Sequence, residues 1–180
     1  MSTDLQGEDG DGFLPARFSR RVFRLFSIVI RRKFRSGFHG LWLTPGTREV
    51  LEGLKEIEGP LIIAMNHVSW WDPLTGMMLH GRFLPEHELS APMDSTQLVK
   101  FGFFRRLGVF GLDPDDPRSL EHMNQWVKQR FEAEPRTVFW LYPQGRFEDV
   151  REAVRPRPGM AVNAASLLTS AYVGAVSGRD

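Results

Sequence analysis

The segment LIIAMNHVSWWDP, residues 61–73, decides the fold. Its first five residues form a short, unbroken apolar run that Gly59-Pro60 precedes, and this pattern predicts a buried strand. The segment ends on Asp72-Pro73, a pair typical of a helix start because Asp caps a helix and Pro suits its first position. The polar residues between the strand and the helix lie where α/β folds often place catalytic groups.

The alternation of strand and helix continues along the chain. We expect a strand and turn at 41–46, and strands at 61–65, 88–92, 109–112, 137–141 and 171–176. We expect helices at 17–35, 48–57, from Asp72, from Ser95 to Leu107, from Asp116 to Phe131 and at 159–170. This order predicts an α/β fold with a mixed, mainly parallel sheet flanked by helices and an N-terminal amphipathic helix.

Length and composition indicate one globular domain. The chain has 180 residues, 42% of them hydrophobic, and a net charge of only +1. It contains no cysteine, which excludes disulfides and thiol catalysis. No secretory signal is visible at the acidic N-terminus, and no apolar run approaches the roughly 20 residues of a membrane span.

The charge is concentrated near the N-terminus. Residues 1–16 are predicted to be a disordered acidic tail. Residues 17–35 contain eight Arg and Lys residues and no acid. One helical face there is apolar; it consists of Phe18, Val22, Leu25, Phe26, Val29 and Ile30. We predict that residues 17–40 form a basic amphipathic helix facing a membrane; the alternative is a helix that packs on its own domain.

Charge alone does not indicate nucleic acid, and we expect none as a partner.

His67 and Asp72 are the candidate catalytic pair. A carboxylate beside an imidazole fixes the tautomer and stabilises the imidazolium that forms when the ring takes a proton. The alternative is that His67 is a turn residue and Asp72 only a helix cap. The two roles of Asp72 are compatible, because a capping carboxylate can also accept a hydrogen bond from an imidazole.

Three motifs resemble those of the glycerolipid acyltransferase family, which includes lysophospholipid and 1-acylglycerol-3-phosphate acyltransferases. NHVSWWDP at 66–73 resembles the first motif of this family. GVFGLD at 108–113 is similar to its Gly-x-x-Phe-Ile-Asp-Arg element, and YPQGR at 142–146 is similar to Phe-Pro-Glu-Gly-Thr-Arg. The motifs occur in the family's order, each at the end of a predicted strand, and the resemblance covers residues 40 to 165.

The resemblance implies an O-acyltransferase. Such an enzyme moves a fatty acyl group from acyl-CoA or acyl-carrier protein to a hydroxyl of a lysophospholipid such as 1-acylglycerol-3-phosphate. His67 would be the general base and Asp72 its orienting partner, while Ser69 would be structural. The substrate-binding residues would be Asn66, Gln144, Gly145 and Arg146. We expect no bound cofactor and no metal, and a peripheral location on the cytoplasmic face of a membrane.

The chain departs from the family pattern in its phosphate-recognition parts. Gln144 replaces the family's Glu, Arg146 comes one place early, and Pro114 stands where the second motif has Arg. Arg105, Arg106 or Arg118 are candidates to compensate. The acceptor therefore stays open between lysophosphatidate and a non-phosphate lipid such as a glycolipid or carotenoid glycoside.

Two further alternatives stay open. Residues 41–180 form the predicted acyltransferase domain, but the C-terminal part lacks the family's Val-Pro-Val strand. A domain that is truncated there would be a catalytically silent lipid- or acyl-binding protein. A metal-dependent hydrolase using His67 and Asp72 is disfavoured, because the other histidines are not at metal-ligand spacing. We expect those histidines, His39, His80, His87 and His122, at the surface or at an interface.

Overall fold

The computed structural model of the chain describes residues 13–113 and 115–155 and the backbone of 172–175. Five parallel strands form one sheet in the order β3-β2-β4-β1-β5. The strands are β1 (Leu61–Ala64), β2 (Glu88–Asp94), β3 (Val109–Leu112), β4 (Thr137–Leu141) and β5 (Tyr172–Ala175). β1 and β4 lie side by side in the sheet, with Leu61 opposite Val138 and Ala64 opposite Leu141. The predicted α/β class and mainly parallel sheet are confirmed.

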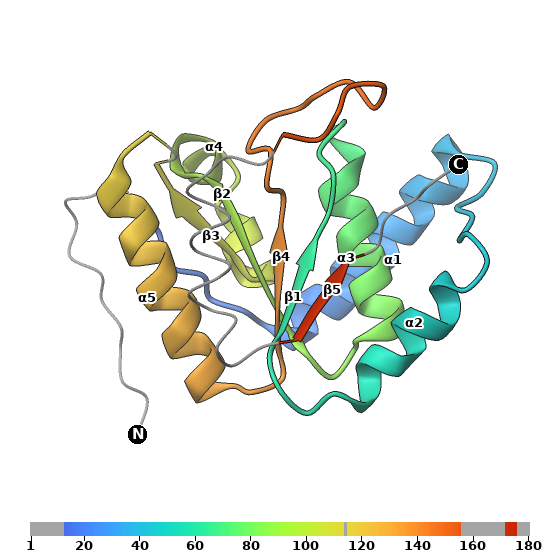
Figure 1. Cartoon of the computed structure of the whole chain (residues 1–180), viewed down its shortest axis with the longest axis horizontal. Helices are drawn as coiled ribbons and strands as arrows, with labels where there is room; N and C mark the ends of the chain where they lie inside the picture. The colour runs from blue at the N-terminus through green and yellow to red at the C-terminus, as the bar shows by residue number, and fades with distance from the viewer. Residues whose placement is uncertain (1–12, 114, 156–171, 176–180) are drawn as a thin grey trace.

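Helices cover both faces of the sheet. They are α1 (Arg20–Gly37), α2 (Thr47–Gly53), η1 (Leu54–Glu56), α3 (Trp71–Phe83), α4 (Ser95–Lys100), η2 (Gly102–Leu107) and α5 (Pro117–Ala133). Figure 1 shows α5 on one side of the sheet and α1, α2 and α3 on the other. Among the described residues, no helix is both long and apolar enough to cross a bilayer.

Alternate residues of the central strands build two separate cores. Leu61 and Ile63 of β1 join the core under α1 and α3, whereas Ile62 joins the core under α5. In β4, Trp140 joins the core under α1 and α3, and Phe139 joins the core under α5. Successive side chains of a strand point to opposite faces, and a parallel sheet is covered on both. This double burial explains why the strand segments read as continuous apolar runs.

The N-terminal helix packs on its own domain. Phe23, Ile30 and Phe34 are buried against the core, whereas Leu25 and Val29 of the predicted apolar face are exposed. The buried stripe is therefore rotated from the predicted face. Near its C-terminal end, α1 covers the start of α3, where the Phe34 and Trp71 rings lie 5.4 Å apart.

Several predicted boundaries change in the structure. Residues 41–43 are not a strand but an irregular segment before α2, with Leu41 and Trp42 exposed and Leu43 partly buried. The helix expected from Ser95 to Leu107 breaks at Phe101 into α4 and η2. Residues 13–16 do not belong to a free tail: Leu14 exchanges two backbone hydrogen bonds with Gly111 of β3. The rest of the predicted tail, the helix at 159–170 and Pro114 lie outside the described residues.

Candidate active site

His67 and Asp72 meet in the turn that joins β1 to α3. His67 lies three residues beyond the end of β1, and Asp72 is the second residue of α3. The distance from His67 Nδ1 to Asp72 Oδ2 is 3.1 Å, and both side chains are mostly buried. With Nδ1 directed at the carboxylate, Nε2 is the ring nitrogen that is left with a free lone pair. An imidazole in this arrangement can accept a proton and keep the resulting positive charge stabilised.

The Asp72 carboxylate also holds the turn together. Its Oδ2 accepts hydrogen bonds from the backbone N–H groups of Val68 (2.6 Å) and Ser69 (2.7 Å), and its Oδ1 accepts one from the Ser69 hydroxyl (3.2 Å). The Ser69 hydroxyl oxygen in turn accepts from the N–H of Trp71 at the start of α3. Asp72 therefore both stabilises the entry to the helix and orients His67. The hydroxyl of Ser69 is engaged in this structural role.

The segment after β4 is fastened to the same turn. Gln144 accepts a hydrogen bond from the His67 N–H at 2.6 Å and donates one through its amide nitrogen to Glu148 at 2.9 Å. The Glu148 N–H donates to the His67 carbonyl oxygen at 2.9 Å. Because β1 and β4 are neighbours in a parallel sheet, their carboxyl ends bring these segments together. The structure thus joins the first and third motifs, 77 residues apart, by hydrogen bonds.

Arg146 lies beside this network and reaches toward solvent. Its Nε donates to Glu148 at 2.9 Å, while 69% of its side chain is exposed. Hydrogen bonds from the Gln144 amide and then from Arg146 hold the pKa of Glu148 below its usual value. Gly145 has a left-handed backbone conformation (φ 64°), and its N–H donates to the Tyr142 carbonyl within the turn. That N–H is therefore used within the turn.

Two aromatic rings enclose His67. The centroid of its imidazole lies 4.6 Å from that of Tyr142 and 4.4 Å from that of Phe147. Trp70 contacts Phe147 in turn, at 5.3 Å, and is largely exposed. Burial, with a contribution from the Asp72 charge, raises the pKa of the Tyr142 hydroxyl, which stays neutral. Tyr142 and Phe147 thus form an apolar wall around one polar group.

Sequence reasoning missed Tyr142, Phe147 and Glu148 as site residues. Tyr142 lies inside the third motif, but the motif does not indicate that its ring contacts His67. Phe147 and Glu148 follow that motif directly, and nothing in their spacing indicated that the chain turns back toward His67. The sequence signal that could have indicated Glu148 is Gln144. A neutral amide, unlike the family's carboxylate, can lie beside a second acid without charge repulsion.

Other predicted residues do not reach the pair. Asn66 is exposed at the start of the turn, beside His67. The second motif lies on β3, which β2 and β4 separate from β1, and Asp113 accepts a hydrogen bond from the Asp115 N–H. The proposed compensating arginines are engaged elsewhere in two cases. Arg105 donates to the Pro15 carbonyl and Arg118 pairs with Asp116.

Two histidines expected at the surface are buried. The expectation was wrong for His80 and His87, whose exposed fractions are 1% and 2%. Burial lowers the pKa of His80 to about 3, so its ring is neutral. It accepts a hydrogen bond from the Trp140 indole and faces the His87 carbonyl oxygen. Within the described ranges, no three His, Cys, Asp or Glu side chains cluster closely enough to hold a metal ion.

Comparison with known proteins identifies the family. A search among curated proteins found no match. The family model described as Acyltransferase matches residues 46–177, nearly three-quarters of the chain, and this range contains both halves of the site. The His67–Asp72 turn and the segment after β4 lie within it, in the order of the motifs. The chain therefore belongs to the acyltransferase family of glycerolipid enzymes.

Proposed function

We propose that this protein transfers a fatty acyl group from an acyl thioester to the hydroxyl of a lysophospholipid, with 1-acylglycerol-3-phosphate as the preferred acceptor. Membership of the family supports acyl transfer in general. The observation that carries the detailed proposal is the 3.1 Å contact between His67 Nδ1 and a carboxylate fixed by the turn. This contact leaves Nε2 as the proton acceptor.

In the proposed reaction, His67 Nε2 takes the proton of the acceptor hydroxyl while the oxygen attacks the thioester carbonyl carbon. A hydroxyl has a pKa far above 7, so this proton transfer is needed for attack. The tetrahedral intermediate then collapses with cleavage of the carbon–sulfur bond. The leaving sulfur takes the proton from the imidazolium, which gives a free thiol and the acyl ester. Asp72 stabilises the imidazolium between these steps.

Arg146 is the proposed contact for the acceptor phosphate. Its Nε is engaged by Glu148, and 69% of its side chain is exposed beside the turn of His67; among the described residues, no hydrogen bond of its two terminal nitrogens is found. Guanidinium groups bind phosphate through paired N–H donors. Glu148 would hold the arginine in place, with Gln144 connecting the same acid to the backbone of His67. This arrangement favours a phosphate-bearing acceptor over a glycolipid or carotenoid glycoside.

The experiment is thiol release from a long-chain acyl-CoA, and from acyl-carrier protein, with a panel of lysolipid and glycolipid acceptors. We expect release that depends on a lysophospholipid, is lost in His67→Ala and is kept in the exposed control His39→Ala. Because the chain has no cysteine, it contributes no thiol background. Release supported equally by non-phosphate acceptors would contradict the assigned acceptor. Lipid binding by a folded parent protein without turnover would instead show a silent binding protein.

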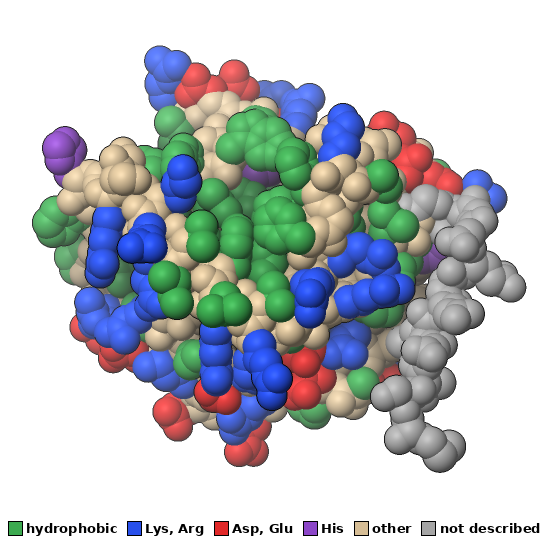
Figure 2. Space-filling model, turned by 180° about the vertical axis from the view of Figure 1, so that it is seen from behind, with side chains coloured by type: hydrophobic (Ala, Val, Ile, Leu, Met, Phe, Trp, Pro, Cys, Tyr) green, Lys and Arg blue, Asp and Glu red, His purple; other side chains and the backbone are tan. Residues whose placement is uncertain are grey.

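We also propose that the protein works at the cytoplasmic face of a membrane as a peripheral protein. Exposed apolar side chains lie on the outer flank of α1 and on the adjoining α4–η2 segment; they are Leu25, Val29, Val99, Phe101 and Phe103. We call them the apolar face. Phe26 joins the two parts, with its ring 5.4 Å from that of Phe103. Figure 2 views the molecule from behind and shows hydrophobic side chains gathered near the centre with Lys and Arg on both sides. This pattern suits an anionic bilayer.

A further inference from the structure

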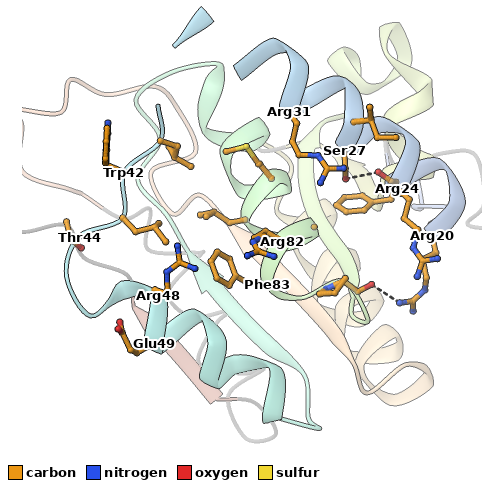
Figure 3. Close-up of a pocket in the computed structure, with 18 of the residues that line it drawn as sticks. Arg20, Arg24, Ser27, Arg31, Trp42, Thr44, Arg48, Glu49, Arg82 and Phe83 are labelled. Carbon is orange, nitrogen blue, oxygen red and sulfur yellow. Dashed lines mark hydrogen bonds between the residues drawn. The ribbon is translucent and has the colours of Figure 1, made fainter. Parts of the chain in front are cut away.

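A large groove lies between α1 and α2, away from His67. Its volume is about 880 Å³, within the usual range for small-molecule sites. Its walls are α1, the segment 41–46 with the start of α2, and the last two turns of α3 (Figure 3). None of its lining residues belongs to the turn 65–72 or to the segment 142–148. The groove is therefore separate from the catalytic pair and needs its own explanation.

The floor of the groove is apolar. It is formed mainly by Phe23, Leu43, Met78, Leu79 and Phe83. Phe23 and Phe83 belong to the buried core, and Leu43, Met78 and Leu79 pack against it while remaining partly accessible. An accessible apolar floor of this size gains free energy when an aliphatic chain replaces the water above it. The floor therefore selects a ligand with hydrocarbon chains.

The rim is strongly basic. Five arginines and one glutamate line the groove, and Figure 3 shows the arginines on walls from α1, α2 and α3. Arg20 and Arg24 are within 4 Å of Glu86, and Arg48 is paired with Glu52. Within the described part of the chain, Arg31 and Arg82 have no carboxylate partner. Two guanidinium groups from the neighbouring helices α1 and α3, with that of Arg82 5.9 Å from the centroid of the Phe83 ring, thus line the groove without a carboxylate.

We propose that this groove binds one anionic phospholipid of the bilayer, with its acyl chains on the apolar floor and its phosphate between Arg31 and Arg82. Free phosphate or a nucleotide would satisfy the arginines but leave the floor in water. A neutral lipid would cover the floor but leave the arginines without a partner. Trp42, of which 88% is exposed, and Leu41 lie at the mouth of the groove, where an amphipathic indole suits a lipid headgroup region.

This lipid is distinct from the acyl acceptor. Asp72 and Leu79 lie on the same helix, α3, about 10 Å apart along its axis at 1.5 Å per residue. A phosphate held by Arg31 belongs to the α1 side of that helix, whereas the proposed acceptor phosphate belongs to Arg146 after β4. The inference goes beyond acyl transfer and does not depend on it, because a bound phospholipid needs no reaction at His67.

The test is calorimetric titration of the full chain with dihexanoyl phosphatidic acid below its micelle concentration. This lipid has both glycerol hydroxyls acylated, so it cannot serve as an acceptor. It is the product type of the proposed reaction, so Arg146→Gln, which removes the proposed acceptor-phosphate contact, tests for binding at the catalytic site. We expect saturable binding that weakens by at least about tenfold in Arg31→Gln/Arg82→Gln, because charge-assisted hydrogen bonds are lost. The matched control is Arg35→Gln/Arg151→Gln, which removes the same charge from exposed positions outside the groove and should change affinity less than about twofold.

Four outcomes decide the proposal. Retained binding in Arg146→Gln is expected, and loss of binding there with full binding in Arg31→Gln/Arg82→Gln would place the lipid in the catalytic site and overturn the inference while leaving acyl transfer intact. Equal weakening in the control variant would show non-specific charge attraction. Equally tight binding of dihexanoyl phosphatidylcholine, which has no net charge, would contradict the proposed preference for an anionic lipid. Full competition by inorganic phosphate at the lipid's own concentration would reduce the groove to an anion site. Unchanged thermal midpoints of all variants establish that each protein is folded.

Discussion

At the scale of single residues, Asp72 combines the two roles that the sequence offers for it, helix cap and partner of His67. It accepts hydrogen bonds from two backbone N–H groups of the turn and faces the imidazole with the same carboxylate. These contacts are compatible because a carboxylate has about four lone-pair sites for acceptance. Helix entry and orientation of His67 are therefore coupled in one side chain, and a conservative substitution is needed to separate them.

Asp72→Asn is expected to lower turnover by about 10²- to 10⁴-fold while the protein still folds, because the amide oxygen can accept from the turn but an N–H would face Nδ1. The measurement is kcat/KM with the thermal midpoint of the same preparation. Asp94→Asn is the control: Asp94 also accepts from two backbone N–H groups, at the start of α4 and away from the site. Parent-like turnover in Asp72→Asn would show that His67 does not need this carboxylate.

Gln144 is explained by its neighbour Glu148. The amide accepts from the His67 N–H and donates to Glu148, which a carboxylate at 144 cannot do. Gln144→Glu is therefore expected to lower the free energy of unfolding at pH 8 by about 1–3 kcal/mol, with a smaller loss at pH 5 as the two acids come to share a proton. Urea unfolding at both pH values measures this.

The charge swap Gln144→Glu/Glu148→Gln is the control for that prediction. It restores a donor opposite an acceptor and leaves an oxygen at 148 for the Arg146 Nε, so stability should return to within about 0.5 kcal/mol of the parent. If the double variant is as unstable as the single one, the loss of stability comes from a changed side-chain shape or from the altered contact with the His67 N–H, and not from two carboxylates facing each other.

At the scale of elements, Gly108 sets the junction between η2 and β3. Its backbone is left-handed (φ 97°), and a Cβ there would lie 1.9 Å from the Leu89 carbonyl oxygen of β2. Gly108→Ala is expected to destabilise the protein by about 2–4 kcal/mol in urea unfolding, because the neighbouring strand must move. Gly53→Ala, at an uncrowded helical position, should be neutral or stabilising. Similar effects at both sites would contradict this account of the junction.

His80 connects α3 to β4 as a neutral ring. Its pKa is lowered to about 3, so the unfolded chain binds the extra proton between pH 6.5 and 3. The stability that depends on neutral His80 is complete above pH 6.5 and is lost as the pH falls below it. Between pH 7 and 5 the parent should therefore lose stability that His80→Gln does not lose. The fall in the free energy of unfolding is expected to be about 2 kcal/mol smaller in His80→Gln than in the parent. Identical pH profiles of the two proteins would show that the fold does not lower the pKa of His80.

At the scale of the whole molecule, α1 presents one flank to the core and another to solvent. Its buried residues fasten it to α3, while Leu25 and Val29 continue the apolar face toward Phe103. Most of the basic residues predicted from the sequence lie on the exposed remainder of the helix; Arg17 precedes α1, and Arg20 is partly buried. The alternatives of a membrane-facing helix and a helix packed on its own domain are therefore compatible in one element.

Vesicle binding tests the apolar face. Leu25→Asp/Val29→Asp is expected to weaken cosedimentation with vesicles rich in anionic phospholipid by at least about tenfold, because two charges would enter the interface. Binding by the parent should also weaken as salt rises from about 0.1 to 1 M. Val150→Asp/Val154→Asp alters two exposed valines on another part of the surface and is the control. Salt-insensitive binding, or equal losses in both variants, would contradict the proposed surface.

The sequence alone determined the α/β class and the central strands, because these depend on local patterns such as an apolar run and a helix start. It also predicted the pairing of His67 with Asp72, through the resemblance of its motifs and not through the spacing of five residues alone. It also predicted the third motif correctly as a strand end. The strand predicted at 41–46 was wrong because the apolar residues 41–43 line a groove instead of joining the sheet.

Only the tertiary structure decided which of these parts meet. The order β3-β2-β4-β1-β5 makes β1 and β4 neighbours and separates β3 from them, so Gln144 and Glu148 reach His67 while Asp113 does not. The same packing buries His80 and rotates the buried stripe of α1. These features depend on contacts between segments far apart in the chain, and local hydrophobic periodicity contains no information about which strands become neighbours.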